Sequence, residues 1–386
     1  MIKITPHTFP LEFNKNFIVG SSIKDTFRID LIRKIGKISF LNLSKDLISF
    51  QAILEREVSS ISFKRGNIVE IAGAVILNNK SKEILRINKI ILLEQGKELI
   101  DSNYYSLKDK SQLRTKTVYR LTTIKENIVE RSLLYEALRK LLRKKEYLET
   151  ICPVITKEYG GANSKSFNTY RKEIEYNLSI CPELYLKRYL LAGFSKIYSI
   201  HRCFRNEGID STHYPEFEMI QIYEVGASAE EMKNLFFQFI TLISERYNIQ
   251  TKYKTRSYFE DPSFTMEKYE RELKNNRGWL VVNGLPHSES PLCKEKKPGL
   301  SDQIQIYYDS LEVANIYTEQ TNHKKLRESF KTSKGDTSSK EEFLQDFEHE
   351  IPPTGGMGFG LDRLLMILLK REKLEEVLPF LIFPFK

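Results

Sequence analysis

The chain has few of the features that mark exported, membrane-bound or zinc-binding proteins. Only four cysteines occur among its 386 residues, and no two of them have the Cys-x-x-Cys spacing of a structural zinc site. No stretch approaches the ~18 consecutive apolar residues that a membrane-spanning helix needs. The first ten residues, MIKITPHTFP, have neither a secretory hydrophobic region nor an Arg- and Ser-rich transit pattern. We therefore expect a cytoplasmic protein with buried free thiols and no membrane association.

Common catalytic motifs are also absent. The phosphate-binding pattern GxxxxGK[ST] does not occur, and the glycine-rich run 355–360 lacks the GxGxxG order of a dinucleotide fold. No convincing Ser-His-Asp or Cys-His set stands out, so a mechanism that uses a protein nucleophile is not expected.

What the chain does have is an excess of positive charge. Hydrophobic residues make up 41% and charged residues 29%, as in a globular protein with true cores, and the formal net charge is +9. A basic surplus permits a polyanionic partner such as RNA. The abundance of Ile, Lys and Asn throughout the chain explains the surplus equally well, so charge alone decides little.

The N-terminal part has the pattern of a small β-barrel. Short runs rich in Ile, Val and Phe are separated by turn-forming stretches such as 44–46 and 64–67. Five such strands favour an OB-fold, with an SH3-like barrel as the structural alternative. The expected strands are 28–34, 37–43, 47–54, 68–75 and 84–93.

The rest of the chain predicts an α+β domain. A polar connector at 94–122 precedes an amphipathic helix at 123–147, which leads toward Pro153. Strands and helices then alternate without a regular βαβ rhythm, which favours an antiparallel sheet flanked by helices. We also expect a helix and a mobile loop within 323–350, and a buried helix after Gly360. The expected domains are 1–105, the barrel, and 106–386, the α+β domain.

One segment combines residue types that suit a nucleotide. Phe204–Gly208 and His213–Phe217 lie between two apolar stretches, which predicts a strand, a polar loop and a second strand. An arginine such as Arg205 can hold a phosphate and a carboxylate together through its planar fork. A nearby acid can accept from an adenine amino group, and an aromatic ring can stack on the base. For any one of these residues, a solvated surface position is the alternative.

A second segment, Gly355–Arg363, leads from glycines into a helix. Glycines allow a ligand to approach the backbone closely, and the N-terminus of a helix favours anions. Arg363 adds a positive charge near that N-terminus, which suits phosphates or a stacked base. Taken alone, a tight turn with a surface arginine is the better explanation of this segment.

Together and in this order, the two segments resemble motifs 2 and 3 of class II aminoacyl-tRNA synthetases, and the helix at 123–147 resembles motif 1, the dimer-forming element. Within that class the lysyl branch is the most similar. Its characteristic stretches are matched by Gly160–Ala162 with Ser166–Thr169, by Pro182–Arg188 (PELYLKR), by Phe204–Phe217 and by Pro352–Thr354. The resemblance runs from about Arg28 to Lys386. It implies a homodimer that activates lysine with ATP and Mg²⁺ and transfers it to tRNA.

The resemblance also implies a role for each matching residue. The implied ATP-binding residues are Arg205 at the α-phosphate, where it also holds the substrate carboxylate, Glu207 and Phe217 at adenine, His213 at the pyrophosphate, Glu312 at the magnesium ion and Arg363 at the γ-phosphate. The implied amino-acid-binding residues are Gly161 and Glu183 at the α-amine, Asn315 at the carboxylate, and Tyr223 and Glu319 at the lysine ε-amine. An acid in the last position is chemically reasonable, because a buried ammonium needs an anion to offset its desolvation.

In the barrel, the resemblance places three residues at the anticodon. Phe40 would stack on a base, Gln51 would read a base edge, and Arg33 could add a phosphate contact. A position in the barrel core is the alternative for Phe40.

Several positions depart from the lysyl pattern. Tyr214 stands in place of an asparagine, Gln221 in place of a glutamate near the substrate side chain, and Gln305 in place of a second metal-binding glutamate. The segment Asn315–Gln320 reads NIYTEQ where the family has N-G-F-x-E-L. Because two carboxylates have become amides, we expect weaker magnesium binding or an altered affinity for the substrate.

Three other functions stay open. A paralogue that lysylates a protein or a small molecule would lack the anticodon barrel, so the apparent barrel argues against it. Aspartyl or asparaginyl specificity is disfavoured by PELYLKR and by Glu319. A non-catalytic tRNA-binding or regulatory protein is compatible with Gln221 and Gln305, but the presence of Arg205 and Arg363 argues for catalysis.

Overall fold

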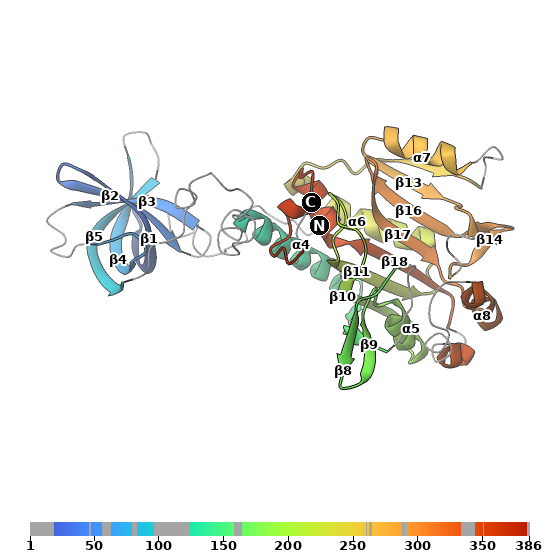
Figure 1. The fold of residues 1–386 in the computed structure, drawn as a ribbon. Coiled ribbons are helices and arrows are strands. Elements are labelled where there is room, and N and C mark those ends of the chain that lie inside the picture. Colours follow the sequence, from blue (N-terminus) through green and yellow to red (C-terminus); the bar gives the residue numbers. More distant parts are fainter. Residues whose placement is uncertain are drawn as a thin grey trace. The chain divides into compact units, whose positions relative to one another are not determined.

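The computed structural model describes residues 19–45, 48–55, 63–78, 83–95, 124–157, 164–259, 261, 265–287, 290, 292–332, 344–349 and 351–383 of the chain. They form two compact units, which divide between Val129 and Glu130. The first unit contains a β-barrel, and the second contains a large sheet with helices (Figure 1). Within these described ranges, every helix is too short or too polar to cross a membrane.

The first unit is a closed barrel with the strand order β1-β2-β3-β5-β4, in which β4 pairs back to β1. Strands β3 and β5 are parallel, and the other neighbours are antiparallel. The predicted OB-fold is therefore confirmed. The strands are β1 Ser22–Ile35, β2 Ile38–Lys45, β3 Ile48–Glu55, β4 Ile68–Leu77 and β5 Glu83–Glu94.

Strand β1 begins earlier than the pattern predicted. Its first half pairs with β4, from Ser22 opposite Ala74, and its second half pairs with β2, to Ile35 opposite Ile38. Strand β1 thus pairs with both β2 and β4, and this double pairing closes the barrel. The early start was missed because Lys24 and the residues after it are polar and interrupt the apolar pattern.

The second unit is built on an eight-stranded sheet with the order β12-β13-β16-β17-β18-β11-β10-β6. Only the pairs at its two edges, β12 with β13 and β10 with β6, are parallel, so the expected antiparallel sheet is confirmed. The strands are β6 Leu148–Glu149, β10 Lys196–Phe204, β11 Glu216–Val225, β12 Tyr253–Ser257, β13 Trp279–Asn283, β16 Gln303–Tyr308, β17 Leu311–Thr318 and β18 Thr354–Gly360.

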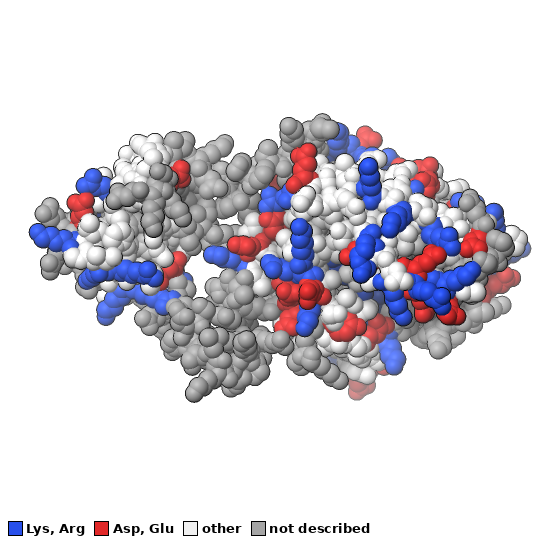
Figure 2. All heavy atoms as spheres, turned by 90° about the horizontal axis from the view of Figure 1, so that it is seen from above, with Lys and Arg blue, Asp and Glu red and all other residues white. Residues whose placement is uncertain are grey.

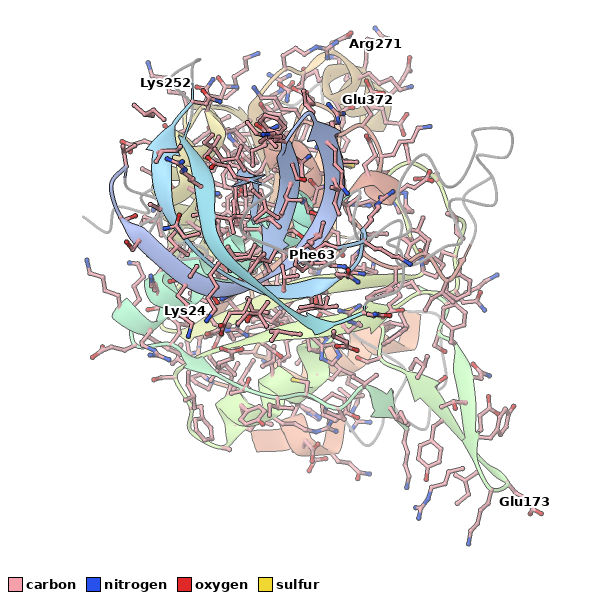
Figure 3. The ribbon with its side chains drawn as sticks, turned by 90° about the vertical axis from the view of Figure 1, so that its left-hand side faces the viewer. Lys24, Phe63, Glu173, Lys252, Arg271 and Glu372 are labelled. Carbon is pink, nitrogen blue, oxygen red and sulfur yellow. The ribbon has the colours of Figure 1, made fainter. Side chains whose placement is uncertain are left out.

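Smaller elements surround the sheet. A three-stranded sheet contains β7 Ile155–Thr156, β8 Asn168–Arg171 and β9 Ile174–Leu178, and a two-stranded sheet contains β14 Glu295–Lys297 and β15 Leu300–Ser301. The β8–β9 hairpin projects from the unit with Glu173 at its tip (Figure 3). The helices among the described residues are α4 Lys125–Lys144, α5 Glu183–Leu191, α6 Ala229–Tyr247, α7 Met266–Asn275, α8 His323–Thr332 and α10 Leu361–Leu368, with the 3₁₀ turns η3 Phe347–His349 and η4 Leu374–Glu376.

The three helices that the sequence predicted are present, and one of them differs in length. Helix α4 ends at Lys144, before the predicted end, because Glu146 takes a φ of 66°, which breaks a right-handed helix. Helix α8 begins at His323 as predicted, while the loop expected after it falls largely on 333–343, outside the described residues. Helix α10 is buried along most of its length, as predicted.

Helix α6 covers one face of the large sheet. Its Phe236 ring lies 5.7 Å from the rings of both Phe359 on β18 and Trp279 on β13, measured between centroids. Edge-to-face packing of this kind buries large apolar areas. The sheet therefore has one sealed face, and a ligand site on it must lie on the other.

On the face that Figure 2 shows, the described charged side chains do not segregate by sign. Basic and acidic side chains are interspersed among the described residues visible on this face. The net charge of +9 therefore gives no single patch that would by itself locate a polyanion on this face.

Candidate active site

The glycine-rich run forms strand β18 at the centre of the sheet, not a tight turn. Gly356 pairs with Tyr223 on β11 and Tyr317 on β17, and Gly358 pairs with Gln221 and Asn315. Residues directly opposite one another share a face of the sheet, so two positions without side chains lie between the side chains of both neighbours, and we call this strip the trough.

The space over these glycines is already shaped by polar side chains. A Cβ placed on Gly356 would lie 2.5 Å from Glu319 Oε1, and one on Gly358 would lie 2.5 Å from Gln221 Oε1. On the opposite face, a Cβ on Gly355 would lie 2.8 Å from Cγ of Met232 in α6. The glycines are thus required by close packing on both faces of one strand.

At one end of the trough, two acids share a buried cation. Lys187 Nζ lies 2.5 Å from Glu183 Oε1 and 2.8 Å from Glu319 Oε2, and Lys187 is only 1% exposed. Glu183 opens helix α5 one turn before Lys187, while Glu319 directly follows β17. These two acids were predicted to bind the amines of a lysine substrate, and the structure brings them together.

Lys187 is the residue that sequence reasoning missed. Its spacing of four residues from Glu183 is that of an ion pair on one helix face. Leu184, Leu186 and Leu190 of the same helix are also buried, so Lys187 lies on a side of the helix that faces the protein interior. The sequence signal that could have predicted a buried ion pair is this lysine among the apolar residues of PELYLKR.

Burial shapes the protonation of this acid end. It raises the pKa of the Glu319 carboxyl to about 7, although the Lys187 ammonium acts in the opposite direction. Burial, with Glu183 and Glu319 nearby, also raises the pKa of the Tyr223 hydroxyl, which accepts a 3.0 Å hydrogen bond from Gln221 Nε2. When both acids are ionised, two carboxylates against one resident cation leave one negative charge, which suits the ammonium of a ligand.

Asn315 lies between this end and the next. It stands on β17 opposite Gln305, and its Oδ1 accepts a 2.8 Å hydrogen bond from Gln303 Nε2. Gln303 is 1% exposed, so the orientation of the Asn315 amide is fixed by a buried partner.

The other end of the trough is rich in arginine. Arg205 follows β10, and its guanidinium carbon lies 5.0 Å from the ring centroid of Phe217. Its buried Nε has no hydrogen-bond partner among the described residues. On β11, Phe217, Met219 and Gln221 are at every second position, so their side chains lie on the same face of the sheet, the one opposite α6. Arg205 is thus held against an aromatic ring with donor capacity left for an anion.

Arg363 brings three more groups to this end. It donates to the backbone oxygens of Thr212 (3.2 Å) and Glu312 (3.0 Å), and its Nη2 lies 2.9 Å from His213 Nε2. Burial lowers the pKa of Arg363. Burial also raises the pKa of the Glu312 carboxyl, although the nearby Arg363 and Arg205 act to lower it. Arg363 therefore contacts both His213 and the backbone of Glu312, whereas Glu207 lies exposed in the β10–β11 loop.

Gln305 is engaged by two tyrosines rather than left open. Its Oε1 accepts hydrogen bonds from Tyr269 (2.7 Å) and Tyr307 (2.8 Å). Glu312 is thus the carboxylate available to a metal here, and the part of the chain that the structure describes holds no cluster of three His, Cys, Asp or Glu. Because Mg²⁺ commonly binds through one or two carboxylates and substrate phosphates, Glu312 fits a single ion carried by a polyphosphate.

Two other predicted positions have definite places. Tyr214, which replaces an asparagine, is buried, and its hydroxyl accepts a 2.8 Å hydrogen bond from the Phe383 amide, so it anchors the C-terminal segment. Gly161 and its neighbours lie in 158–163, outside the described residues.

The three barrel residues lie on the outer surface. Arg33 on β1 is exposed and pairs with Phe40 on β2, and Gln51 on β3 is exposed. Phe40 is half-buried, while the adjacent Leu41 points into the core. The alternative that Phe40 is a core residue is therefore wrong.

Comparison with known proteins agrees with this geometry. Residues 109–383 match the family of class II tRNA synthetases (D, K and N). The chain is 28% identical to lysine–tRNA ligase 2 of Methanosarcina mazei, with 96% of this chain and 86% of the relative covered. It is 25% identical to the lysine–tRNA ligase of Fusobacterium nucleatum, with 96% and 92% covered, and 28% identical to that of Fervidobacterium nodosum, with 94% and 84% covered. The chain therefore belongs to the class II tRNA synthetase family of the D, K and N type.

Proposed function

We propose that the protein is a lysine–tRNA ligase, which activates lysine with ATP and transfers it to tRNA. The observation that carries the proposal is the trough with ends of opposite charge. Glu183 and Glu319 form the end for the ammonium groups of lysine, and Arg205 and Arg363 form the end for phosphates. The names of the related proteins support the same assignment.

Lysine fits the acid end by charge and by hydrogen bonding. Its ε-ammonium would lie against Glu319 and the hydroxyl of Tyr223, which are both fully buried. Its α-amine would lie against Glu183, with Gly161 as a further partner, and its carboxylate against Asn315 and Arg205. A buried ammonium is stable only beside such partners.

ATP and Mg²⁺ would occupy the arginine end. We propose that Arg205 holds the α-phosphate, that Phe217 and Glu207 bind adenine, and that His213 and Arg363 bind the outer phosphates. Glu312 would hold the magnesium ion, which supplies charge neutralisation at the phosphates when bound. The chain's own contribution to the reaction is to position the lysine carboxylate for attack on the α-phosphate and to stabilise the developing charge with Arg205.

The second step needs tRNA. We propose that residues 1–105 form an anticodon-binding domain with Arg33, Phe40 and Gln51 on its binding surface, and that 106–386 form the catalytic domain. Such an enzyme would act in the cytoplasm. Replacing Phe40 by Ala should raise the KM for tRNA roughly tenfold, because one stacked base is worth about 1–3 kcal/mol, while lysine activation stays unchanged.

We further propose that the enzyme is a homodimer. Apolar side chains are exposed at Leu148 (50%) on edge strand β6, and at Ile151 (86%) and Ile155 (59%) in the segment that follows. Contiguous exposed apolar residues beside a sheet edge are typical of a surface that another chain covers.

Pyrophosphate exchange into ATP, measured with each of the twenty amino acids and followed by charging of total tRNA, tests the proposal. Exchange that requires lysine and gives charged tRNA is the expected result. Exchange with lysine but without charging would assign the acceptor to a protein or a small molecule. Exchange with aspartate or asparagine, or with no amino acid, would overturn the lysine assignment.

A further inference from the structure

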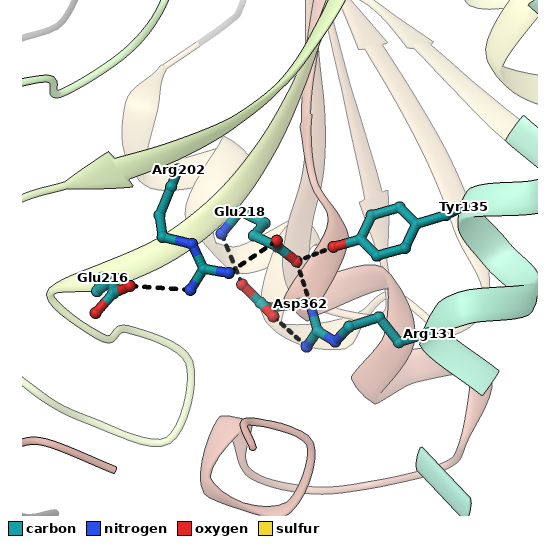
Figure 4. A network of polar contacts seen from close by, with 6 residues as sticks. All are labelled: Arg131, Tyr135, Arg202, Glu216, Glu218 and Asp362. Atoms are coloured by element: carbon teal, nitrogen blue, oxygen red, sulfur yellow. Dashed lines mark hydrogen bonds and ion pairs between the residues drawn. The ribbon is translucent and has the colours of Figure 1, made fainter. Parts of the chain in front are cut away.

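A network of charged residues lies behind the arginine end of the trough. Arg131 of α4 places Nη1 2.6 Å from Glu218 Oε2 and Nη2 2.5 Å from Asp362 Oδ1 (Figure 4). Asp362 Oδ2 in turn accepts a 2.8 Å hydrogen bond from the backbone N–H of Glu218. One side chain of α4 thus joins the beginning of β11 to the beginning of α10.

Two further residues complete the network around Glu218. Arg202 of β10 lies 3.0 Å from Glu218 Oε1 and 2.9 Å from Glu216 Oε1, and the Tyr135 hydroxyl donates to Glu218 Oε2. Because side chains alternate along a strand, Glu216 and Glu218 face away from the side of β11 that carries Phe217. The network is therefore behind the trough and does not line it.

Both carboxylates that Arg131 holds are next to candidate ATP-binding residues in the chain. Glu218 directly follows Phe217, whose ring packs against Arg205. Asp362 directly precedes Arg363, which contacts Thr212, His213 and Glu312. A shift of either carboxylate moves the backbone that carries one of these two residues.

Charge explains why Arg131 is the critical member. The side chains of Glu218 and Asp362 are 15% and 4% exposed, so water does little to screen the repulsion between their carboxylates. Although burial opposes its charge, Asp362 and Glu218 raise the pKa of Arg131 above its usual range. Without this cation, Glu218 would keep only its pair with the half-exposed Arg202, Asp362 would lose its ion pair, and the two poorly solvated carboxylates would repel each other.

We propose that Arg131 is a positioning residue for the ATP site. By binding Glu218 of β11 and Asp362 of α10, it fixes the two elements relative to each other, so that Phe217 and Arg363 keep the positions that the nucleotide needs. The proposal rests on the proposed ATP-dependent function. It assigns Arg131 no contact with ATP, because it acts through Glu218 and Asp362. Its loss should weaken ATP binding far more than lysine binding.

The test compares Arg131→Met, Arg131→Lys and the double variant Arg131→Met with Glu218→Gln. The dissociation constant of ATP is measured by calorimetry, and the KM values for ATP and lysine by pyrophosphate exchange. Arg131→Met should weaken ATP binding about tenfold with the KM for lysine unchanged. Arg131→Lys and the double variant should each recover part of the affinity, the first by restoring a cation and the second by removing one of the opposed charges.

Arg143→Met is the matched control, since Arg143 is an exposed arginine on the same helix, and it should change neither constant. Thermal unfolding shows whether each variant is folded. A folded Arg131→Met protein with unchanged ATP affinity, or with equal losses for ATP and lysine, would overturn the proposal. Calorimetry with ATP does not depend on the amino acid used, so an enzyme that fails to activate lysine still tests the role of Arg131.

Discussion

The two ends of the trough hold their charges in different ways. At the acid end, Glu319 and Lys187 are each 1% exposed, and the acids are paired with a cation that the protein itself supplies. At the arginine end, Arg205 and Arg363 are only partly buried, and Arg363 is held mainly by backbone oxygens. At the acid end, one of the two carboxylate charges is therefore balanced before any ligand arrives, whereas the arginine end keeps positive charge for an anion.

This difference fits the two kinds of ligand that the trough is proposed to bind. An ammonium group is a small cation, so a single excess negative charge in a dry pocket is enough to select it. A polyphosphate carries several charges and a metal ion, which suits a more open end with separate cationic donors. Each of the following substitutions should therefore act on one end and spare the other.

The largest effect is expected at Arg205. Replacing it by Ala should lower kcat/KM for pyrophosphate exchange by roughly 10³-fold, since it removes a preorganised donor aimed at the reacting phosphate. Steady-state exchange kinetics measure the loss. Arg271→Ala, a change at an exposed arginine of α7, is the control and should be neutral. A loss below about tenfold would show that Arg205 is not at the reacting centre.

The next largest effect is on stability, at the acid end. Lys187→Met should lower the free energy of unfolding by about 3–5 kcal/mol, because it leaves two buried carboxylates without their cation. Urea unfolding followed by circular dichroism measures it. Lys140→Met removes a pair of the same spacing, with Glu136, from an exposed position, and should cost less than about 1 kcal/mol. Equal losses in the two variants would contradict the role given to Lys187.

A smaller effect is expected from adding charge to the acid end. Gln221→Glu places a carboxylate beside Tyr223, which should lower the KM for lysine about tenfold and leave the KM for ATP unchanged. The same change should destabilise the ligand-free protein, and lysine should reverse this loss in thermal unfolding. Gln238→Glu on the exposed side of α6 is the control. A KM for lysine that rises would show that Gln221 is better suited to the substrate than an acid is.

The smallest effect is a dependence on pH. Because burial raises the pKa of Glu319 to about 7, its ionised fraction falls as the pH drops through neutrality, and the KM for lysine should rise severalfold. Stability has the opposite sign: a carboxyl with a raised pKa in the folded state contributes stability as it is protonated, and that contribution is lost as the pH rises. Exchange kinetics across this range measure the first effect, and Glu319→Gln should abolish it.

The amino-acid sequence by itself determined the elements and the chemistry of the site. Short runs rich in Ile, Val and Phe, separated by turn-forming stretches, predicted all five barrel strands. The resemblance to class II synthetases implied that Arg205, His213, Glu312 and Arg363 serve one site, and in the structure Arg363 contacts His213 and the backbone oxygen of Glu312. These features are local, so they can be read without knowing which strands are neighbours.

Only the tertiary structure decided how the charges are paired. Gly356 and Gly358 open the trough because β18 lies between β11 and β17, an arrangement that depends on strand order and not on the glycines themselves. Likewise, Lys187 reaches Glu319, and Arg131 reaches Asp362, from segments far apart in the chain. The partner of a buried charge is set by which elements pack together, since burial makes an unpaired charge costly but does not specify where its partner lies in the sequence.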